Sequence, residues 1–358
     1  MNYEITELKE ENEQEYRNFI LKHNSLIEFE PEWRKIVESN FGFKAIYLIA
    51  KKKDNESNGG GIAAVLPLFE ANSFLFGKRL ISTPFAVHTG ILSDEKEEGA
   101  VTALTKFAKD LAKLNGYKFL EIRKKEKDSS PDNEFTVKED VYDFSLKINR
   151  PLENIWKFLP KNSVRWGIKK AKKSNLTIRS GNSRKELNDF YNLFLTTRKY
   201  RGVPAYPKPF FIDILDTFKE KIKIYVCEFN NEPVAAVMML FHNKRIRYFH
   251  AGTKPQTKIL RMQPYHLLFW TVITEGHNLG YETFDLGGST KLANNGGLYS
   301  FKEKWADSIK PIPSYYYSAS GKIPLSSTSG IKLAGMIWKK LPLKIVDKIS
   351  PFVIKQFV

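Results

Sequence analysis

The chain has 358 residues, of which 42% are hydrophobic and 13% aromatic, a length and composition typical of two folded domains. Lys and Arg outnumber Asp and Glu by 57 to 40. The resulting formal charge of +17 favours anionic or phosphorylated partners, although a solvated basic surface has the same composition. The single cysteine, Cys227, excludes an internal disulfide framework and a cysteine-based zinc site.

Several classes of protein are disfavoured by motifs that the sequence lacks. The chain begins without a secretory signal and has no apolar run of the roughly 20 residues that span a bilayer, so we expect a cytoplasmic protein. Cys227 lies in an apolar run and is expected to be a buried strand thiol rather than a nucleophile. The histidines lack metal-ligand spacing and no dinucleotide-binding glycine motif is present. We therefore predict no metal and no permanently bound cofactor.

Two blocks of sequence recur in the same order in the two halves of the chain. A pair of apolar strands is expected at 45–69 and again at 224–241, where G-I-A-A-V-L-P-L-F matches P-V-A-A-V-M-M-L-F. A helix that ends at a glycine and leads into another strand follows at 100–122 and at 264–286. The repeated order indicates a duplicated unit rather than a chance similarity of strand patterns.

The order strand, strand, strand, helix, strand predicts a mixed, mostly antiparallel sheet flanked by helices in each half, and not a doubly wound parallel sheet. We expect an N-terminal domain at 1–148, a C-terminal domain at 149–320 and a basic amphipathic helical tail at 321–358. The tail alternates apolar residues with lysines. It is therefore expected either to lie on an anionic membrane surface or to pack on the protein body.

The loop before the second helix predicts a phosphate-binding site. Lys258 and Arg261 precede Pro264, which suits the first turn of a helix whose N-terminal N–H groups attract anions. The corresponding loop of the first half, 83–90, contains no Lys or Arg, as expected if only the second copy binds a donor. Basic loops before helices are common, so a purely solvated role is the alternative.

The strand that ends at Asp285 opens into two glycines, where backbone can approach a ligand closely. Asp285 is expected either to accept a proton from, or orient, an amine nucleophile, or to form an ion pair, because Glu121 occupies the matching place in the first half. Farther on, a short helix is expected to place Lys302 and Trp305 on one face, with Lys302 facing a substrate phosphate.

Two further segments of the second half are rich in cations. The segment 161–173, which includes Arg165 and Lys169, predicts an amphipathic helix that either holds phosphates or an RNA backbone or is simply solvated. The segment 198–204, with Arg198 and Arg201, predicts a loop that lines the substrate site.

Four motifs together resemble the Fem-like branch of the GCN5-related N-acetyltransferase superfamily, which includes peptidoglycan interpeptide-bridge aminoacyltransferases. They are N-S-V-R-W-G-I-K-K-A-K-K from Asn162, Q-P-Y from Gln263, Y-E-T-F-D-L-G-G-S from Tyr281 and Y-S-F-K-E-K-W from Tyr299. The resemblance covers 3–317. It implies two tandem acetyltransferase-like domains, with the donor bound where two central strands of the second sheet splay apart.

The resemblance also implies a reaction, in which an amine attacks an activated acyl carbonyl without a covalent enzyme intermediate. The co-substrate would be an acyl-CoA or an aminoacyl-tRNA, and the acceptor an amine, for example on a cell-envelope precursor. The long coiled-coil arm of many peptidoglycan enzymes of the family is absent, which weakens the case for tRNA, so both donors remain open.

These observations yield a set of predicted site residues. The predicted catalytic residues are Asp285 and Lys302; the predicted donor-binding residues are Lys258, Arg261, Met262, Gln263, Tyr265, Gly287 and Ser289; and the predicted substrate-binding residues are Arg165, Lys169, Arg198, Arg201, Tyr248, His250 and Trp305. A non-catalytic protein that binds RNA or an anionic membrane is the alternative function. A DNA-binding regulator is disfavoured because no DNA-binding motif accompanies the charge.

Overall fold

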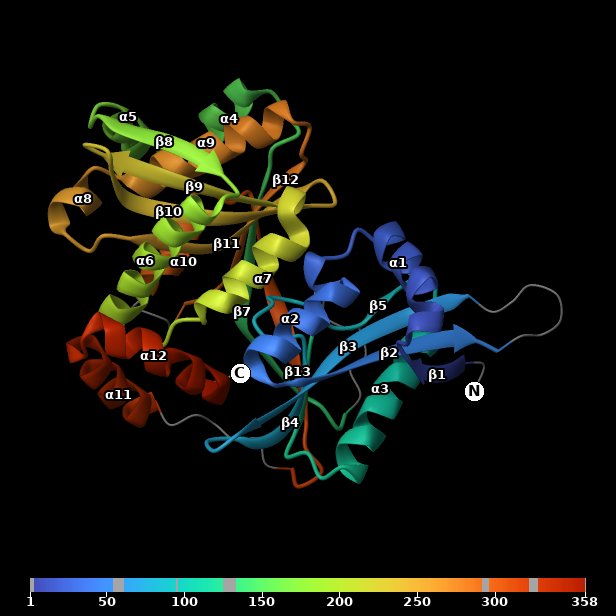
Figure 1. Cartoon of the computed structure of the whole chain (residues 1–358). Helices are drawn as coiled ribbons and strands as arrows, with labels where there is room; N and C mark the ends of the chain where they lie inside the picture. Colours follow the sequence, from blue (N-terminus) through green and yellow to red (C-terminus); the bar gives the residue numbers. More distant parts are fainter. Residues whose placement is uncertain are drawn as a thin grey trace. The chain divides into compact units, whose positions relative to one another are not determined.

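The computed structural model describes residues 3–53, 61–94, 96–124, 133–291, 296–321 and 328–357 (Figure 1). The chain forms two compact units. The first comprises Met1–Val141, Pro311–Leu325 and Lys355–Val358, and the second Tyr142–Lys310 and Ser326–Ile354. This division differs from the sequence-based boundaries at 148 and 320, because a late strand returns to the first unit and most of the helical tail belongs to the second.

The first unit is built on a sheet in which one neighbouring pair is parallel. Its strands lie in the order β1 (Tyr3–Glu7), β2 (Lys44–Lys52), β3 (Ile62–Ser73), β4 (Gly77–Ser82), β6 (Leu120–Arg123) and β13 (Ser308–Tyr317), and β5 (Leu92–Ser93) pairs with β3. The pairs among β1 to β4 and the pair of β6 with β13 are antiparallel, whereas β4 and β6 are parallel. Residues 315–317 lie within the C-terminal domain expected at 149–320, but the structure pairs them with β6 of the first unit.

Helix α3 (Glu98–Leu114) lies between β5 and β6 in the chain and packs against the core of the first unit. Ala100, Leu104 and Ala108 are buried at helical spacing against β2 and β3, and small side chains at such positions let a helix approach a sheet closely. The remaining helical segments of this unit are η1 (Glu10–Asn12), α1 (Glu13–Lys22), η2 (Ile27–Phe29), α2 (Pro31–Phe41) and η6 (Lys355–Phe357).

The second unit has the same strand arrangement. Its strands lie in the order β8 (Leu176–Gly181), β9 (Ile222–Phe229), β10 (Glu232–His242), β11 (Arg245–Thr253), β12 (Thr283–Thr290) and β7 (Thr136–Lys147). The pairs from β8 to β11 are antiparallel and the pair of β11 with β12 is parallel. The predicted fold of two similar units, each with a mixed, mostly antiparallel sheet flanked by helices, is therefore confirmed.

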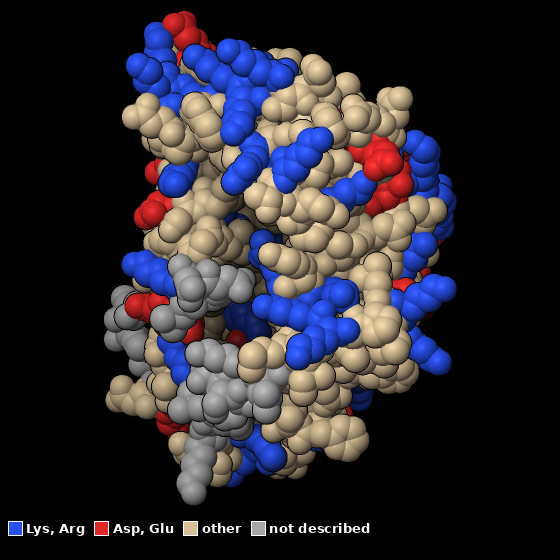
Figure 2. Space-filling view, turned by 90° about the vertical axis from the view of Figure 1, so that its left-hand side faces the viewer, with Lys and Arg blue, Asp and Glu red and all other residues tan. Residues whose placement is uncertain are grey.

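The helices of the second unit lie on both faces of its sheet. They are α4 (Leu152–Phe158), the π-helix η3 (Lys161–Arg165), α5 (Trp166–Lys172), α6 (Arg184–Arg201), α7 (Lys208–Phe218), η4 (Lys219–Lys221), α8 (Thr257–Arg261), α9 (Pro264–Asn278), α10 (Gly297–Glu303), α11 (Thr328–Lys340) and α12 (Leu343–Ile354). The predicted basic helix corresponds to η3 and α5. Lys and Arg side chains gather at the top of the face shown in Figure 2, at the level of α5 in Figure 1.

Helix α6 packs closely against β11. It begins at a capping box in which Lys185 N donates to Ser183 Oγ at 3.1 Å. A Cβ atom on Gly252 of β11 would lie 2.1 Å from the backbone nitrogen of Phe194 in α6. Only glycine therefore permits this approach of helix to strand.

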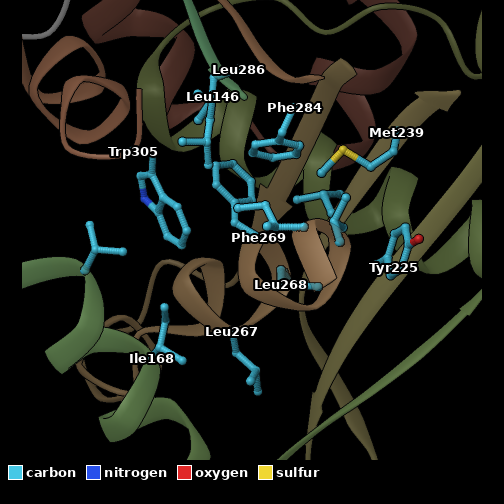
Figure 3. Packing of buried hydrophobic residues seen from close by; sticks show 14 of the residues in the cluster. Leu146, Ile168, Tyr225, Met239, Leu267, Leu268, Phe269, Phe284, Leu286 and Trp305 are labelled. Atoms are coloured by element: carbon cyan, nitrogen blue, oxygen red, sulfur yellow. The ribbon is translucent and has the colours of Figure 1, made fainter. Parts of the chain in front are cut away.

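The core of the second unit surrounds α9. Figure 3 shows Phe269 of α9 facing Phe284 and Leu286 of β12, with Trp305 beside them, and all four side chains are buried. Cys227 is buried in β9, as predicted, and burial raises the pKa of its thiol to about 12, which excludes a thiolate nucleophile at neutral pH. Within the part of the chain that the structure describes, we find no helix with the length and apolar character needed to cross a membrane.

Candidate functional site

The parallel pairing of β11 and β12 stops in the middle of the second sheet. Arg245, Ile246 and Arg247 pair with Thr283, Phe284 and Asp285, and the pairing ends there although both strands continue. Two irregularities cause the separation. The register of β10 with β11 shifts so that Phe249 is an extra, bulged residue, and Gly287 of β12 has a left-handed φ of 68°.

A cavity of about 510 Å³ lies where the two strands separate. It is bounded by β11, by the C-terminal half of α6, by the first turns of α9 and by α10. Its walls are formed by Phe194, Thr197, Arg198, Arg201, Tyr248, Phe249, His250, Ala251, Tyr265, Phe269, Gly288, Gly297, Leu298, Phe301 and Lys302. A concave, largely aromatic site with a few charged groups is the usual form of a small-molecule or cofactor site.

One wall of the cavity is aromatic and surrounds a neutral histidine. The ring centroid of His250 lies 4.8 Å from that of Tyr206, 5.3 Å from that of Phe194 and 5.5 Å from that of Phe211. Burial, reinforced by the nearby positive charge of Arg198, keeps the pKa of His250 well below its ordinary value. His250 is therefore uncharged at neutral pH.

Two arginines of α6 reach the same cavity from positions three residues apart. Arg198 donates from Nε and Nη2 to the carbonyl oxygen of Pro204, at 2.8 and 2.5 Å, and its guanidinium lies over the rings of Phe194 and Tyr206. Arg201 is exposed. The first arginine is thus held in place by the protein, and the second is free to contact solvent or a bound anion.

Lys302 is the buried cation at the open end of β12. Only 3% of the residue is exposed, and its Nζ donates to the carbonyl oxygens of Gly287 at 3.1 Å and Gly288 at 2.8 Å. Burial lowers the pKa of Lys302 to about 8, an effect that the negative charges of Asp285 and Asp143 oppose. The group therefore carries a positive charge at neutral pH but loses it in mildly alkaline solution.

Asp285 of β12 interacts electrostatically with Lys302 and forms hydrogen bonds with groups of its own sheet. Its carboxylate accepts a hydrogen bond from Arg245 Nη1 at 3.0 Å and another from the backbone nitrogen of Gly287 at 2.7 Å. The second bond holds the turn of β12 at which Gly287 and Gly288 present their carbonyl oxygens to Lys302. Both hydrogen bonds engage the Asp285 carboxylate within its own sheet. Asp285 is therefore placed to hold the β12 turn rather than to act as a base.

Asp143 of β7 is a further member of this cluster that the sequence analysis missed. Burial, followed by the negative charge of Asp285, raises the pKa of Asp143 to about 7, although Arg245 and Lys302 favour its ionised form. The only sequence signal is an acidic residue within the apolar strand V-Y-D-F-S-L at 141–146. An acid in such a strand is ordinary on a solvated face, so the sequence could not identify it.

The predicted site residues fall into two groups. Six of them line the cavity: Arg198, Arg201, Tyr248, His250, Tyr265 and Lys302. Asp285, Gly287 and Ser289 lie on β12 beside it, with Ser289 buried. The structure therefore brings together residues from α6, β11, α9, β12 and α10 that are far apart in the sequence.

The other predicted residues lie away from the cavity walls. Lys258 and Arg261 are exposed on α8, Lys169 is exposed on α5, and Arg165 in η3 is half-buried. Gln263 caps α9 with a left-handed φ of 64°, and Met262 packs against the core. The remaining residue, Trp305, is fully buried against Phe269 and is a core residue in this structure. Among the described residues, no group of three or more His, Cys, Asp or Glu could hold a metal ion.

Comparison with known proteins agrees with this fold. Residues 161–303 match the family described as Acetyltransferase (GNAT) domain. A curated relative, the UDP-N-acetylmuramoylpentapeptide-lysine N(6)-alanyltransferase of Weissella viridescens, is 24% identical over 161 residues. The match covers 44% of this chain and 45% of that protein, so it spans less than half of the relative.

Two solved structures share the fold over most of their length. A crystal structure of FemX superposes with a TM-score of 0.65 at 13% identity, covering 88% of this chain and 97% of that one. A tandem GNAT protein from the clavulanic acid biosynthesis pathway has a TM-score of 0.53 at 8% identity, covering 90% and 100%. Residues 161–303 are thus similar to an acetyltransferase (GNAT) domain, and the fold of the chain is similar to that of FemX and of a tandem GNAT protein.

Proposed function

We propose that the protein is an N-acyltransferase that moves an acyl or aminoacyl group from an activated donor to an amine. The observation that carries the proposal is the interrupted pairing of β11 and β12 beside a cavity of about 510 Å³ that contains Lys302. Where the pairing stops, backbone N–H groups that would otherwise bond the neighbouring strand can face a ligand, and a cation lies next to them.

The proposed reaction is direct nucleophilic acyl transfer. The nitrogen of a neutral amine attacks the carbonyl carbon of the donor and forms a tetrahedral oxyanion. The bond from carbon to the leaving sulfur or oxygen then breaks, an amide results, and the amine proton passes to the leaving group. Backbone N–H groups and the Lys302 ammonium would stabilise the oxyanion, because preorganised donors are most effective in a site that excludes water. Asp285 would hold the β12 turn that positions Lys302.

The donor would be an aminoacyl-tRNA or an acyl-CoA, in which the carbonyl is activated as an ester or thioester on a polyanionic carrier. Arg198 and Arg201 suit a phosphate at the cavity, while the exposed Lys258 and Arg261 near the start of α9 suit the more distant phosphates of a large carrier. Both donors occur in the cytoplasm, which is where we expect the reaction to take place.

The acceptor would be an amine on a cell-envelope precursor. The support is the match to a relative whose name specifies alanyl transfer to the lysine N6 of UDP-N-acetylmuramoylpentapeptide. An acceptor of this kind carries a diphosphate, which agrees with the arginines of the cavity and with the net charge of +17.

A donor and acceptor panel tests the proposal. The full chain is incubated with alanyl-, glycyl- or seryl-tRNA, or with acetyl-CoA, together with a UDP-linked muropeptide that has a free lysine amine, and the acceptor mass is measured. We expect a mass increase of one acyl or aminoacyl group with one class of donor. If neither class gives product, and neither donor raises the melting temperature at saturating concentration, the protein is not an acyltransferase of this type.

A further inference from the structure

Lysines outnumber acidic residues on the C-terminal helices α11 and α12. Residues 328–354 contain five lysines and a single acidic residue, Asp347. The Asp347 carboxylate accepts a hydrogen bond from the hydroxyl of Tyr191 in α6 at 2.6 Å, so it is already engaged by the protein body. The lysines whose side chains the structure describes, Lys339, Lys340, Lys344 and Lys348, are exposed with little acidic compensation.

One face of this hairpin is fixed to α6 and to the loop that follows it (Figure 1). Val346, Ser350 and Ile354 are buried along one side of α12, and Ser350 Oγ accepts a hydrogen bond from the backbone nitrogen of Ala205 at 3.1 Å. Close packing also joins α11 to the end of α6, since a Cβ atom on Gly202 would lie 2.6 Å from the carbonyl oxygen of Gly335. The helices thus have a defined inner face.

The opposite face exposes large apolar side chains. Ile345 and Phe352 are 45% and 68% exposed and lie two helical turns apart, on the side of α12 away from Ser350. On α11, Met336 is 56% exposed. Large apolar side chains exposed on one face usually mark an interaction surface.

Lysines border this apolar face on both helices. Lys344 and Lys348 are exposed one turn apart on α12, and Lys340 is exposed one turn beyond Met336 on α11. A row of apolar side chains bordered by lysines is the pattern of a helix that lies in the plane of a lipid interface. The apolar groups enter the headgroup region while the ammonium groups contact lipid phosphates.

We propose that the outer face of α11 and α12, formed by Met336, Ile345 and Phe352 with Lys340, Lys344 and Lys348, docks on the surface of an anionic phospholipid bilayer. The apolar side chains lie at separate positions on the two helices, which suits a fluid interface. The exposed lysines favour an anionic partner. Helices of 13 and 12 residues are too short to cross the bilayer, so the contact is peripheral. This inference does not depend on the proposed acyl transfer.

Vesicle sedimentation with the full chain tests the proposal. We expect binding to vesicles of equal parts phosphatidylglycerol and phosphatidylcholine, and none to pure phosphatidylcholine. Substituting Lys340, Lys344 and Lys348 by Gln together should weaken binding by about fivefold for each lysine, since each cation near such a surface contributes about that factor. Raising the salt from roughly 0.1 to 1 M should have a similar effect, because it shortens the screening length.

A second triple variant, with Met336, Ile345 and Phe352 changed to Ser, should reduce binding at least about tenfold through the loss of buried apolar area. Its matched control carries Leu260→Ser and Leu279→Ser, two exposed leucines elsewhere on the same unit, and should bind as the parent does. The lysine control changes Lys157, Lys172 and Lys173 to Gln.

Three results would overturn the proposal: equal binding to both kinds of vesicle, an apolar triple variant that binds like the parent, or a control pair or triple that loses as much binding as the matching variant. Self-association of the parent protein that the apolar triple variant abolishes, without vesicle binding, would assign the surface to a second copy instead. Circular dichroism confirms that each variant is folded.

Discussion

The two units share one structural frame and differ at the point where their parallel strands meet. In the first unit, β4 and β6 pair only through Leu80 with Leu120 and Ile81 with Glu121. In the second, β11 and β12 pair up to Arg247 with Asp285. An acidic residue therefore occupies the last paired position of the later strand in both units, so the duplication preserved this element of the frame.

Beyond that position the units diverge. In the first unit the chain after β4 follows β6 closely. Ser82 Oγ accepts a hydrogen bond from Arg123 N at 2.9 Å, and Arg123 Nη1 donates to the carbonyl oxygen of Ala86 at 3.2 Å. A Cβ atom on Gly90 would lie 2.5 Å from the carbonyl oxygen of Arg123, so backbone fills the space beside β6. In the second unit the corresponding space is the cavity with Lys302. The difference supports our proposal that the second copy carries the site and the first serves as a scaffold.

Neutralising the shared acid in each unit should separate these roles and produce the largest effect on stability. Asp285→Asn removes a carboxylate that is 1% exposed and faces the positive charges of both Arg245 and Lys302, and removing one member of such a buried cluster costs about 3 kcal/mol or more. Glu121→Gln removes a more exposed carboxylate, and its amide oxygen can still accept from Arg123 and Tyr316, which lie 2.7 and 3.1 Å from the carboxylate, so it should cost about 1–2 kcal/mol. Urea unfolding of the two variants measures both. Equal losses would show that the two acids have equivalent surroundings.

Replacing Lys302 of the second unit should affect activity rather than stability. Lys302→Met keeps an unbranched side chain in the buried position but removes the ammonium. We expect the rate of acyl transfer to fall about 10²-fold, the usual consequence of losing one oxyanion-stabilising group. Single-turnover kinetics measure the rate, and a melting temperature within a few degrees of the parent serves as the control. A variant with unchanged kcat would remove Lys302 from the mechanism.

The frame of each unit could be predicted from sequence because it depends on local patterns. Apolar strands and helices that end at a glycine recur with fixed spacing, and Gly116 and Gly280 adopt the predicted left-handed φ of 64° and 76°. The position of β13 could not be predicted, because pairing between distant strands leaves no local signal. Asp143 and Phe194 were missed for the same reason: each reaches the site only through the tertiary fold.

The pH dependence should report the environment of Lys302 in the second unit. Since burial lowers the pKa of Lys302 to about 8, the ratio of the parent rate to the rate of Lys302→Met should decline above that pH, to about one tenth of its maximum one unit higher, because both proteins share the titration of the acceptor amine. Unfolding does not explain such a decline. Between pH 8 and the ordinary lysine pKa of 10.5 the unfolded chain binds more protons, so this group makes the folded state more stable as pH rises.

The residual activity of Lys302→Met tests this assignment. Its rate should continue to rise with pH as the acceptor amine is deprotonated, whereas the rate of the parent enzyme should level off above pH 8. A parent rate that rises from pH 8 to 10 as steeply as that of Lys302→Met would contradict a role for the charged lysine.

The smallest effect on stability is expected from a substitution at the end of β4 in the first unit. Ser82→Ala removes the hydroxyl that accepts a hydrogen bond from Arg123 N, and the loss should cost about 1 kcal/mol of unfolding free energy. Acyl transfer should be unaffected, because the substitution lies in the unit that we interpret as a scaffold. Urea unfolding and initial rates on the same preparation measure the two quantities. If the rate falls by tenfold while stability changes little, the first unit contributes directly to the reaction, and the contrast between scaffold and site would have to be abandoned.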